Sequence, residues 1–457
     1  MIRVPGLPEA ETQLLNSLHE QLKAKQPRNQ LRSALMDHRR TFEDWHLMQE
    51  NTNLQAVLGW PAKAVETLGR RSRLEGFALP GQELSAFGLD EILEQTQYLR
   101  RARMAELASL SHAVSFEVAT TGDGVDEPDA LITHVSALNG TGTWSNRLGR
   151  LTDCLSVASW DAEGKPEDWA LYLDEGTWSR KNGELSYAKH KLGRVPVEPL
   201  IYKPRLDRPF GQSRITRSVI FLTRSACRVI VRSEATADLY SAPGLLALGL
   251  TAEQIAEGSW RTGIGNVIGI PDADEGPADA PQLARAAIHM VQQASQEPHV
   301  AQLRAWAQLF AGETSIPVSS LGISFDGNPT SAESYAASRE DLIAEAEDAN
   351  GEWGAAHRRS LLNAWALREG VSIADLPAEL LALRAKHRDP RHISQAAAAD
   401  AFVKVAGAIP GLAQTDAGID MLGLDPSIAE RLKVELRRSR ASSMVNALAG
   451  IGDGNLG

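Results

Sequence analysis

The glycines and serines of this chain do not form the motifs of a nucleotide-dependent or serine-dependent enzyme. Gly263 and Gly265 begin a dinucleotide-binding pattern, but Ile268 stands where the third glycine is required. No Gly-x4-Gly-Lys-Ser/Thr phosphate loop occurs, and no Gly-x-Ser-x-Gly nucleophile elbow occurs. These patterns indicate a flexible turn at 263–265 and predict no catalytic residues.

The histidines are also poorly spaced for metal chemistry. His19 and Glu20 lack the second histidine of a zinc-protease helix, because Lys23 occupies its position. His387 and His392 flank a short charged segment without a cysteine or a third ligand nearby. We therefore expect these two histidines to be surface groups, and we predict no metal and no cofactor.

Arginines form the clearest chemical pattern. Arg217, Arg224, Arg228 and Arg232 are spaced by seven, four and four residues, which places them on one face of a helix predicted over 212–241. Residues 331–352 carry seven acidic residues against one arginine. Both segments could be ordinary solvated faces. If copies of the chain repeat around an axis, the basic face can pair with a neighbouring copy, and the acidic face can meet one.

The composition indicates a soluble, core-forming chain. It has 457 residues, 43% of them hydrophobic, which corresponds to about three domains or one elaborate domain. Its two cysteines favour a reducing compartment. The start of the chain lacks the apolar core of a signal peptide, and no apolar run is long enough to span a membrane. The net charge of −11 argues against tight DNA binding, which needs basic side chains to neutralise phosphates.

Hydrophobic periodicity predicts an α+β fold with several long helices. The stretch 115–205 contains short apolar runs between turns, which predicts a roughly half-exposed β-rich layer. Pro27 is expected to end the first helix or start the next, and Pro61 to lie in a first turn. By composition, residues 282–294 also look helical. Helices are also predicted over 9–58, 90–115, 212–241, 298–312, 330–367 and 390–450. One further helix is predicted to begin at residue 60.

Several segments resemble segments of the portal family of tailed DNA phages, and they occur in the order of that family along the chain. Leu58–Phe77 is similar to its N-terminal wing segment, and Val195–Leu206 with Pro209–Ile215 to the approach to its first stem helix. Ser320–Ile323 and Asn328–Glu333 are similar to the segment before its long tunnel helix. The resemblance covers most of residues 40–370. Residues beyond 390 match the family poorly, and only their position at the C-terminal end of the chain supports assigning them to its crown region.

The resemblance implies a portal fold with a mainly helical wing and stem, a small α/β clip and a helical C-terminal crown. It makes residues 282–294 part of the extended clip, in conflict with their helical composition. The implied regions are the wing at 1–211, the first stem helix at 212–241, the clip at 242–294, the second stem helix at 295–313, the tunnel loop at 314–331, the returning wing at 332–389 and the crown at 390–457.

The implied function is that of a non-enzymatic subunit of a dodecameric ring at one capsid vertex of the virion, assembled in the host cytoplasm. Double-stranded DNA would pass through the ring. The implied partners are other copies of the chain, terminase, the major capsid protein, a scaffold protein and a head–tail adaptor, with no membrane. The tunnel loop would touch DNA through small polar groups without gripping it. Its residues are Ser319, Ser320, Ser324, Asp326 and Asn328.

Two alternatives stay open at this point. The first is another head–tail structural ring protein, such as an adaptor, although adaptors are usually shorter than this chain. The second is a cytoplasmic α+β enzyme. A ring with a central hole would favour the portal, and a compact monomer or dimer would favour the enzyme.

Overall fold

A computed structural model describes most of the chain. The described residues are 2–41, 55–122, 126–241, 245–250, 267–271, 287–290, 295–322, 339–391, 395–424 and 426–452. The chain divides into a body, Met1–Arg388, and a C-terminal unit, Asp389–Gly457. Both units contain helices, and the body also contains four sheets, so the α+β prediction is confirmed.

The predicted β-rich layer is present as two antiparallel sheets in the body. One sheet has the strand order β3-β2-β9, and the other is a meander of five strands, β4-β5-β6-β7-β8. The strands are β2 (Val114–Thr121), β3 (Ala130–Ser136), β4 (Gly140–Ser145), β5 (Arg150–Trp160), β6 (Pro166–Tyr172), β7 (Gly176–Lys181), β8 (Glu184–Lys189) and β9 (Val197–Ile201).

The prediction that this layer is half-exposed is wrong for strands β2 and β9. The first six residues of β2 and all five of β9 are buried. Phe116 and Val118 pack against the five-stranded sheet, whereas Ala119 packs with apolar residues from the helices on the other side. A strand covered on both faces has no solvent side, so alternation of polar and apolar residues is not required of it.

The first helix, α1 (Glu9–Met36), runs through Pro27, where we predicted a break. Proline removes one backbone hydrogen bond from the helix interior. Leu15, Leu18 and Leu22 are fully buried against the five-stranded sheet, and this packing keeps the segment helical. The helical prediction past residue 36 is wrong for the described residues, since 37–41 and 55–59 are not helical.

The following helices are shorter than predicted. Helix α2 (Trp60–Arg71) begins with Pro61 in its first turn, as predicted. The predicted helix 90–115 is instead α3 (Leu89–Gln95) and α4 (Tyr98–His112), because Gln97 adopts a left-handed conformation between them. Ala113 also has a positive φ, which ends α4 and starts β2.

Helix α9 (Glu340–Glu369) is the central helix of the body. Its first half places Leu342 and Trp353 in one apolar core with α2 and the stem helices, and its second half places Leu361 in another core beside α3 and α4. The helix ends at Gly370, whose left-handed conformation suits a glycine. The predicted start at residue 330 lies outside the described residues.

Two small sheets complete the body. Strands β1 (Leu74–Ala78) and β13 (Arg384–His387) form an antiparallel pair. Strands β10 (Leu245–Leu250), β11 (Val267–Pro271) and β12 (Ala287–Met290) form a mixed sheet in the order β11-β10-β12. The helical prediction for 282–294 is therefore wrong at 287–290, where backbone pairing with β10 overrides local composition.

The C-terminal unit is helical, as its alanine content predicts. It contains α10 (Gln395–Ala408), α11 (Asp416–Met421) and α12 (Pro426–Gly452). The Thr415 hydroxyl caps α11 by accepting a hydrogen bond from the backbone N–H of Gly418. Among the described helices of the whole chain, none is long and apolar enough to cross a bilayer.

Candidate functional site

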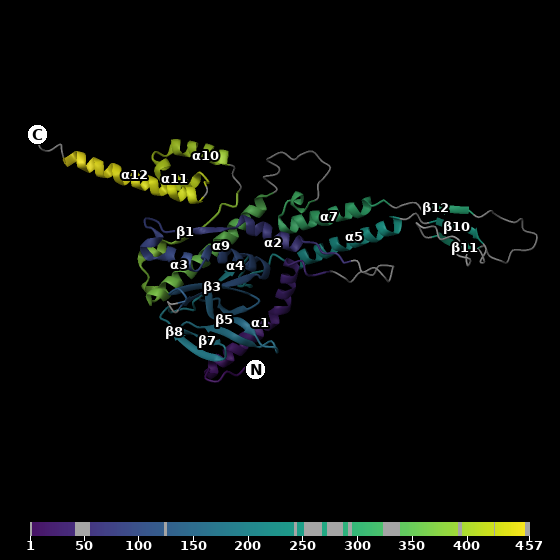
Figure 1. Cartoon of the computed structure of the whole chain (residues 1–457), viewed down its shortest axis with the longest axis horizontal. Helices are drawn as coiled ribbons and strands as arrows, with labels where there is room; N and C mark the ends of the chain where they lie inside the picture. The colour runs from purple at the N-terminus through teal and green to yellow at the C-terminus, as the bar shows by residue number, and fades with distance from the viewer. Residues whose placement is uncertain are drawn as a thin grey trace, which may run out of the picture. The chain divides into compact units, whose positions relative to one another are not determined.

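Two antiparallel helices form the predicted stem. Helices α5 (Arg217–Ser241) and α7 (Glu297–Thr314) lie side by side (Figure 1). Thr216 bonds to Glu313 at one end, and Ser233 bonds to Gln296 at the other, which sets the antiparallel direction. Between the ends, buried Ala226, Ala307 and Phe310 belong to one apolar core. The chain leaves α5 for the β10–β12 sheet and returns from it through α7.

The first stem helix begins at residue 217 and not at the predicted 212. Side-chain hydrogen bonds hold the preceding residues in a non-helical turn. Ser213 Oγ donates to the Ser111 carbonyl and accepts from the N–H of Ile215. Thr216 Oγ1 then accepts from the N–H of Val219, which caps the helix.

All four arginines of the predicted basic face lie on α5. Arg217 and Arg232 are exposed, and Arg224 and Arg228 are partly exposed. The spacing places the first and last about 22 Å apart along the helix axis. Phe221 lies one turn after Arg217 and is 59% exposed, with its ring edge-on to Trp306 of α7. This basic face, which we call the arginine stripe, therefore combines four arginines with an exposed aromatic ring.

A buried arginine joins the start of α5 and the end of α7 to helices α2 and α9. The side chain of Arg214 is 4% exposed and forms an ion pair with Glu345 of α9. Its guanidinium donates to the carbonyl of Ala64 at 2.6 Å, to the carbonyl of Thr314 at 2.6 Å and to the Tyr202 hydroxyl at 3.1 Å. Arg214 thus ties the approach to α5, the end of α7, helix α2 and helix α9 together.

Glu345 completes this arginine joint, which we define as Arg214, Glu345, Tyr202 and Lys203. Glu345 accepts hydrogen bonds from Tyr202 and Lys203 in addition to the ion pair with Arg214. Burial by itself would raise the pKa of Glu345, but the Arg214 charge and these hydrogen bonds outweigh it and lower the pKa. The carboxylate therefore stays ionised inside the body.

The start of the predicted tunnel loop follows α7 closely. Ser319 and Ser320 lie in a single 3-10 turn, Val318–Leu321, directly after Pro317. Ser319 is exposed and Ser320 is partly exposed. The remaining predicted loop residues, Ser324, Asp326 and Asn328, lie outside the described residues.

Residues 13–414 match the family described as Phage portal protein, SPP1 Gp6-like. The chain belongs to this phage portal family. The matched range contains every residue predicted for the stem and the tunnel loop, and the resemblance predicted from the ordered segments is confirmed.

Two relatives are portal proteins of mycobacteriophages. The chain is 29% identical to the portal protein of Mycobacterium phage D29 over 404 residues, which cover 84% of this chain and 79% of that protein. It is 28% identical to the portal protein of Mycobacterium phage L5 over 392 residues, covering 82% and 77%.

Two solved assemblies contain chains that match part of this one. One is the neck of an empty gene transfer agent particle, with a TM-score of 0.47 and 13% identity, covering 85% of this chain and 96% of that one. The other is the virion of a native gene transfer agent particle, with a TM-score of 0.43 and 13% identity, covering 80% and 90%.

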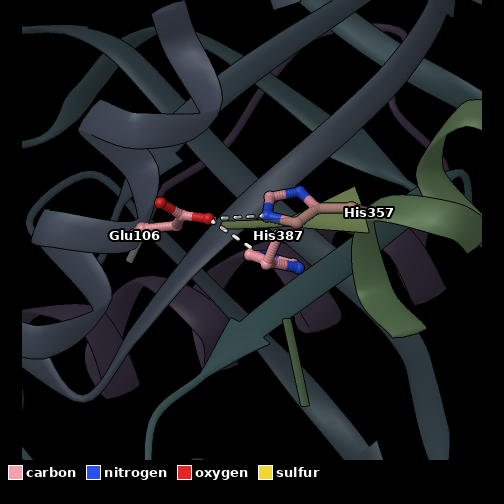
Figure 2. Close-up of side chains that lie close together, drawn as sticks. All are labelled: Glu106, His357 and His387. Atoms are coloured by element: carbon pink, nitrogen blue, oxygen red, sulfur yellow. Dashed lines mark hydrogen bonds and ion pairs between the residues drawn. The ribbon is translucent and has the colours of Figure 1, made fainter. Parts of the chain in front are cut away.

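The structure brings together one buried group of ionisable residues that the sequence did not predict. His387 is not the surface group we predicted, because its side chain is only 7% exposed and lies 3.5 Å from Glu106. His357 of α9 lies 3.2 Å from the same carboxylate oxygen (Figure 2). The three residues are far apart in the sequence, so no local spacing motif could have identified them. His392 lies outside the described residues.

Proposed function

We propose that the chain is the ring-forming portal subunit of a phage capsid, and that double-stranded DNA enters and leaves the capsid through the ring. The family match over residues 13–414 carries this proposal. It favours a structural portal over the two alternatives, an adaptor-type ring protein and an α+β enzyme. The chain would then be a virion component at the capsid vertex.

Exposed apolar groups on the stem support assembly into a ring. Phe221 is 59% exposed and contacts Trp306, which lies one turn before Leu309, itself 56% exposed. Neighbouring apolar side chains on a surface favour a protein contact, and a cyclic assembly would bury this patch in every subunit. The arginine stripe on the same helix would pair with the next subunit or contact the DNA.

The regional roles follow from the family resemblance. We assign 1–211 and 332–389 to the wing, 212–241 and 295–313 to the stem, 242–294 to the clip, 314–331 to the tunnel loop and 390–457 to the crown. The clip would dock terminase during packaging and the head–tail adaptor afterwards. The major capsid protein and a scaffold protein would contact the ring at the vertex. We propose a dodecamer, assembled in the host cytoplasm.

The tunnel loop would line the narrowest part of the channel. Its predicted contacts are hydroxyl and amide groups and the single carboxylate of Asp326, and no lysine or arginine occurs between Pro317 and Thr330. Each basic side chain would add a salt-dependent attraction for phosphate, which a ring would multiply. A loop without such groups would let the duplex move.

Electron microscopy of the purified, untagged chain tests the ring. We expect cyclic particles with a central hole, and a monomer that persists across buffers and in capsids would contradict the proposal. Replacing Ser324 and Asp326 with lysine then tests the loop. Rings should still form, but packaging should slow, with an effect that weakens at high salt. Normal packaging by rings that contain both lysines would place the loop away from DNA.

A further inference from the structure

Three elements of the body bring one glutamate and two histidines together. Glu106 comes from α4, His357 from α9 and His387 from β13, and their side chains converge on one point (Figure 2). The side chains are 2%, 0% and 7% exposed. We call these three residues the His-Glu cluster. It lies in the body, and neither the stem nor the tunnel loop contributes to it.

The distances suit a tetrahedral metal ion. Glu106 Oε1 lies 3.2 Å from His357 Nε2 and 3.5 Å from His387 Nε2, and the three possible ligand atoms all lie within 4.8 Å of one another. A zinc ion with bonds of about 2.0–2.1 Å in tetrahedral geometry has neighbouring ligand atoms ~3.3 Å apart. The two separations from Glu106 Oε1 are therefore already close to the spacing that such an ion requires.

The second nitrogen of His357 is held in the way that metal-binding histidines require. His357 Nδ1 lies 2.9 Å from Glu117 Oε1, opposite the nitrogen that faces Glu106. Glu117 is fully buried and is itself held by Tyr98, whose hydroxyl donates to it, and by His134 at 2.9 Å. A carboxylate on the far nitrogen fixes the ring and its tautomer, which leaves Nε2 available to a cation.

Two atoms of the cluster lack hydrogen-bond partners among the described residues. They are Glu106 Oε2 and His387 Nε2, both buried. Buried polar atoms in folded proteins are nearly always satisfied, and an unsatisfied one often indicates an ion or a water. His387 Nε2 faces the point where the three side chains converge, so a cation bound there would satisfy this nitrogen.

We propose that Glu106, His357 and His387 bind one zinc ion, with Glu117 as the residue that positions His357. Two imidazoles and one carboxylate favour zinc over magnesium or calcium, which prefer all-oxygen ligands. A fourth position would be taken by water. The ion would link α4, α9 and the short strand β13, and so hold the β1–β13 pair against the central helix. Its role would be structural.

Zinc binding to the purified, untagged full chain tests the proposal. We expect elemental analysis after dialysis against zinc to give one ion per chain, and cobalt in its place to give the visible absorption of a tetrahedral site. H387Q and E106Q should each lose this ion. E117Q should keep it but bind it about 10–100-fold more weakly, because the orienting carboxylate is lost. H38Q, which removes an exposed histidine, should bind as the wild type does.

The variants must be compared in a folded state, so circular dichroism and particle shape accompany each measurement. Absence of zinc and cobalt binding in the wild-type chain would overturn the proposal whether or not any variant folds. Binding by H387Q and E106Q at wild-type stoichiometry would also overturn it, since the ion would then sit elsewhere. Loss of binding in folded H387Q and E106Q, with H38Q unaffected, would establish the site.

Discussion

Glu345 and His357 lie on the same helix, about 18 Å apart along its axis, and each belongs to a buried ionic site. At the arginine joint, the charge of Arg214 meets Glu345, and its remaining N–H groups meet two backbone carbonyls and a tyrosine. At the His-Glu cluster, two imidazoles face the carboxylate of Glu106, which keeps one oxygen without a hydrogen bond among the described residues.

The comparison indicates how two buried charged sites on one helix can differ in purpose. A site whose donors and acceptors are all hydrogen-bonded has no capacity left for a ligand. The arginine joint therefore serves to hold helices α5 and α7 against helices α2 and α9. A site with unsatisfied atoms that converge on one point has that capacity, so the His-Glu cluster suits a cation. Completeness of hydrogen bonding, more than burial or charge, separates the two.

The largest expected effect comes from removing Arg214. R214M should lower the free energy of unfolding by about 3–5 kcal/mol, because a buried ion pair loses one partner. R103M is the matched control, since Arg103 is exposed on α4, and its effect should stay within about 0.5 kcal/mol. Denaturant unfolding measures both. Equal losses in the two variants would mean that the joint does not hold the stem.

A smaller effect should follow metal removal from the His-Glu cluster. At a free zinc concentration 100 times the dissociation constant, binding should stabilise the chain by about 2.7 kcal/mol relative to chelator-treated protein. H387Q should show the same stability with zinc and with chelator. Thermal unfolding of both proteins under both conditions measures the difference. If chelator destabilised H387Q as much as the wild type, the stabilising ion would lie outside the cluster.

The smallest effect is expected from neutralising Glu345 while keeping its shape. E345Q should cost on the order of 2 kcal/mol at pH 7, less than R214M, because glutamine retains hydrogen bonding and Arg214 keeps its carbonyl partners. The folded pKa of Glu345 lies below its ordinary 4.5. Its contribution to stability is therefore complete above about pH 4.5 and is lost as the pH falls through the folded pKa.

The free energy of unfolding, measured from pH 7 down to acidic pH, tests whether the contribution of Glu345 to stability falls as the pH falls. The wild-type chain should lose more stability than E345Q across the acid range, so that the two curves converge at low pH. Parallel curves would show that Glu345 has the same pKa in the folded and unfolded chain, which would contradict its place in the arginine joint.

Local patterns in the sequence determined much of the helical framework. Pro61 marked the start of α2, and the apolar stripe with its arginines marked α5, because periodicity and capping act within a few residues. The ordered portal-like segments also indicated the family that residues 13–414 match. These signals depend on neighbouring positions, so they can be identified before any fold is known.

Only the tertiary structure decided the rest. Pro27 stays inside α1 because the buried face of that helix packs on a sheet formed more than 100 residues later. Arg214 meets Glu345, and Glu106 meets His357, across 131 and 251 residues of chain. Such contacts arise from how helices and sheets pack, and packing brings together side chains whose separation in the sequence carries no period. The arginine joint and the His-Glu cluster therefore became visible only once the chain was folded.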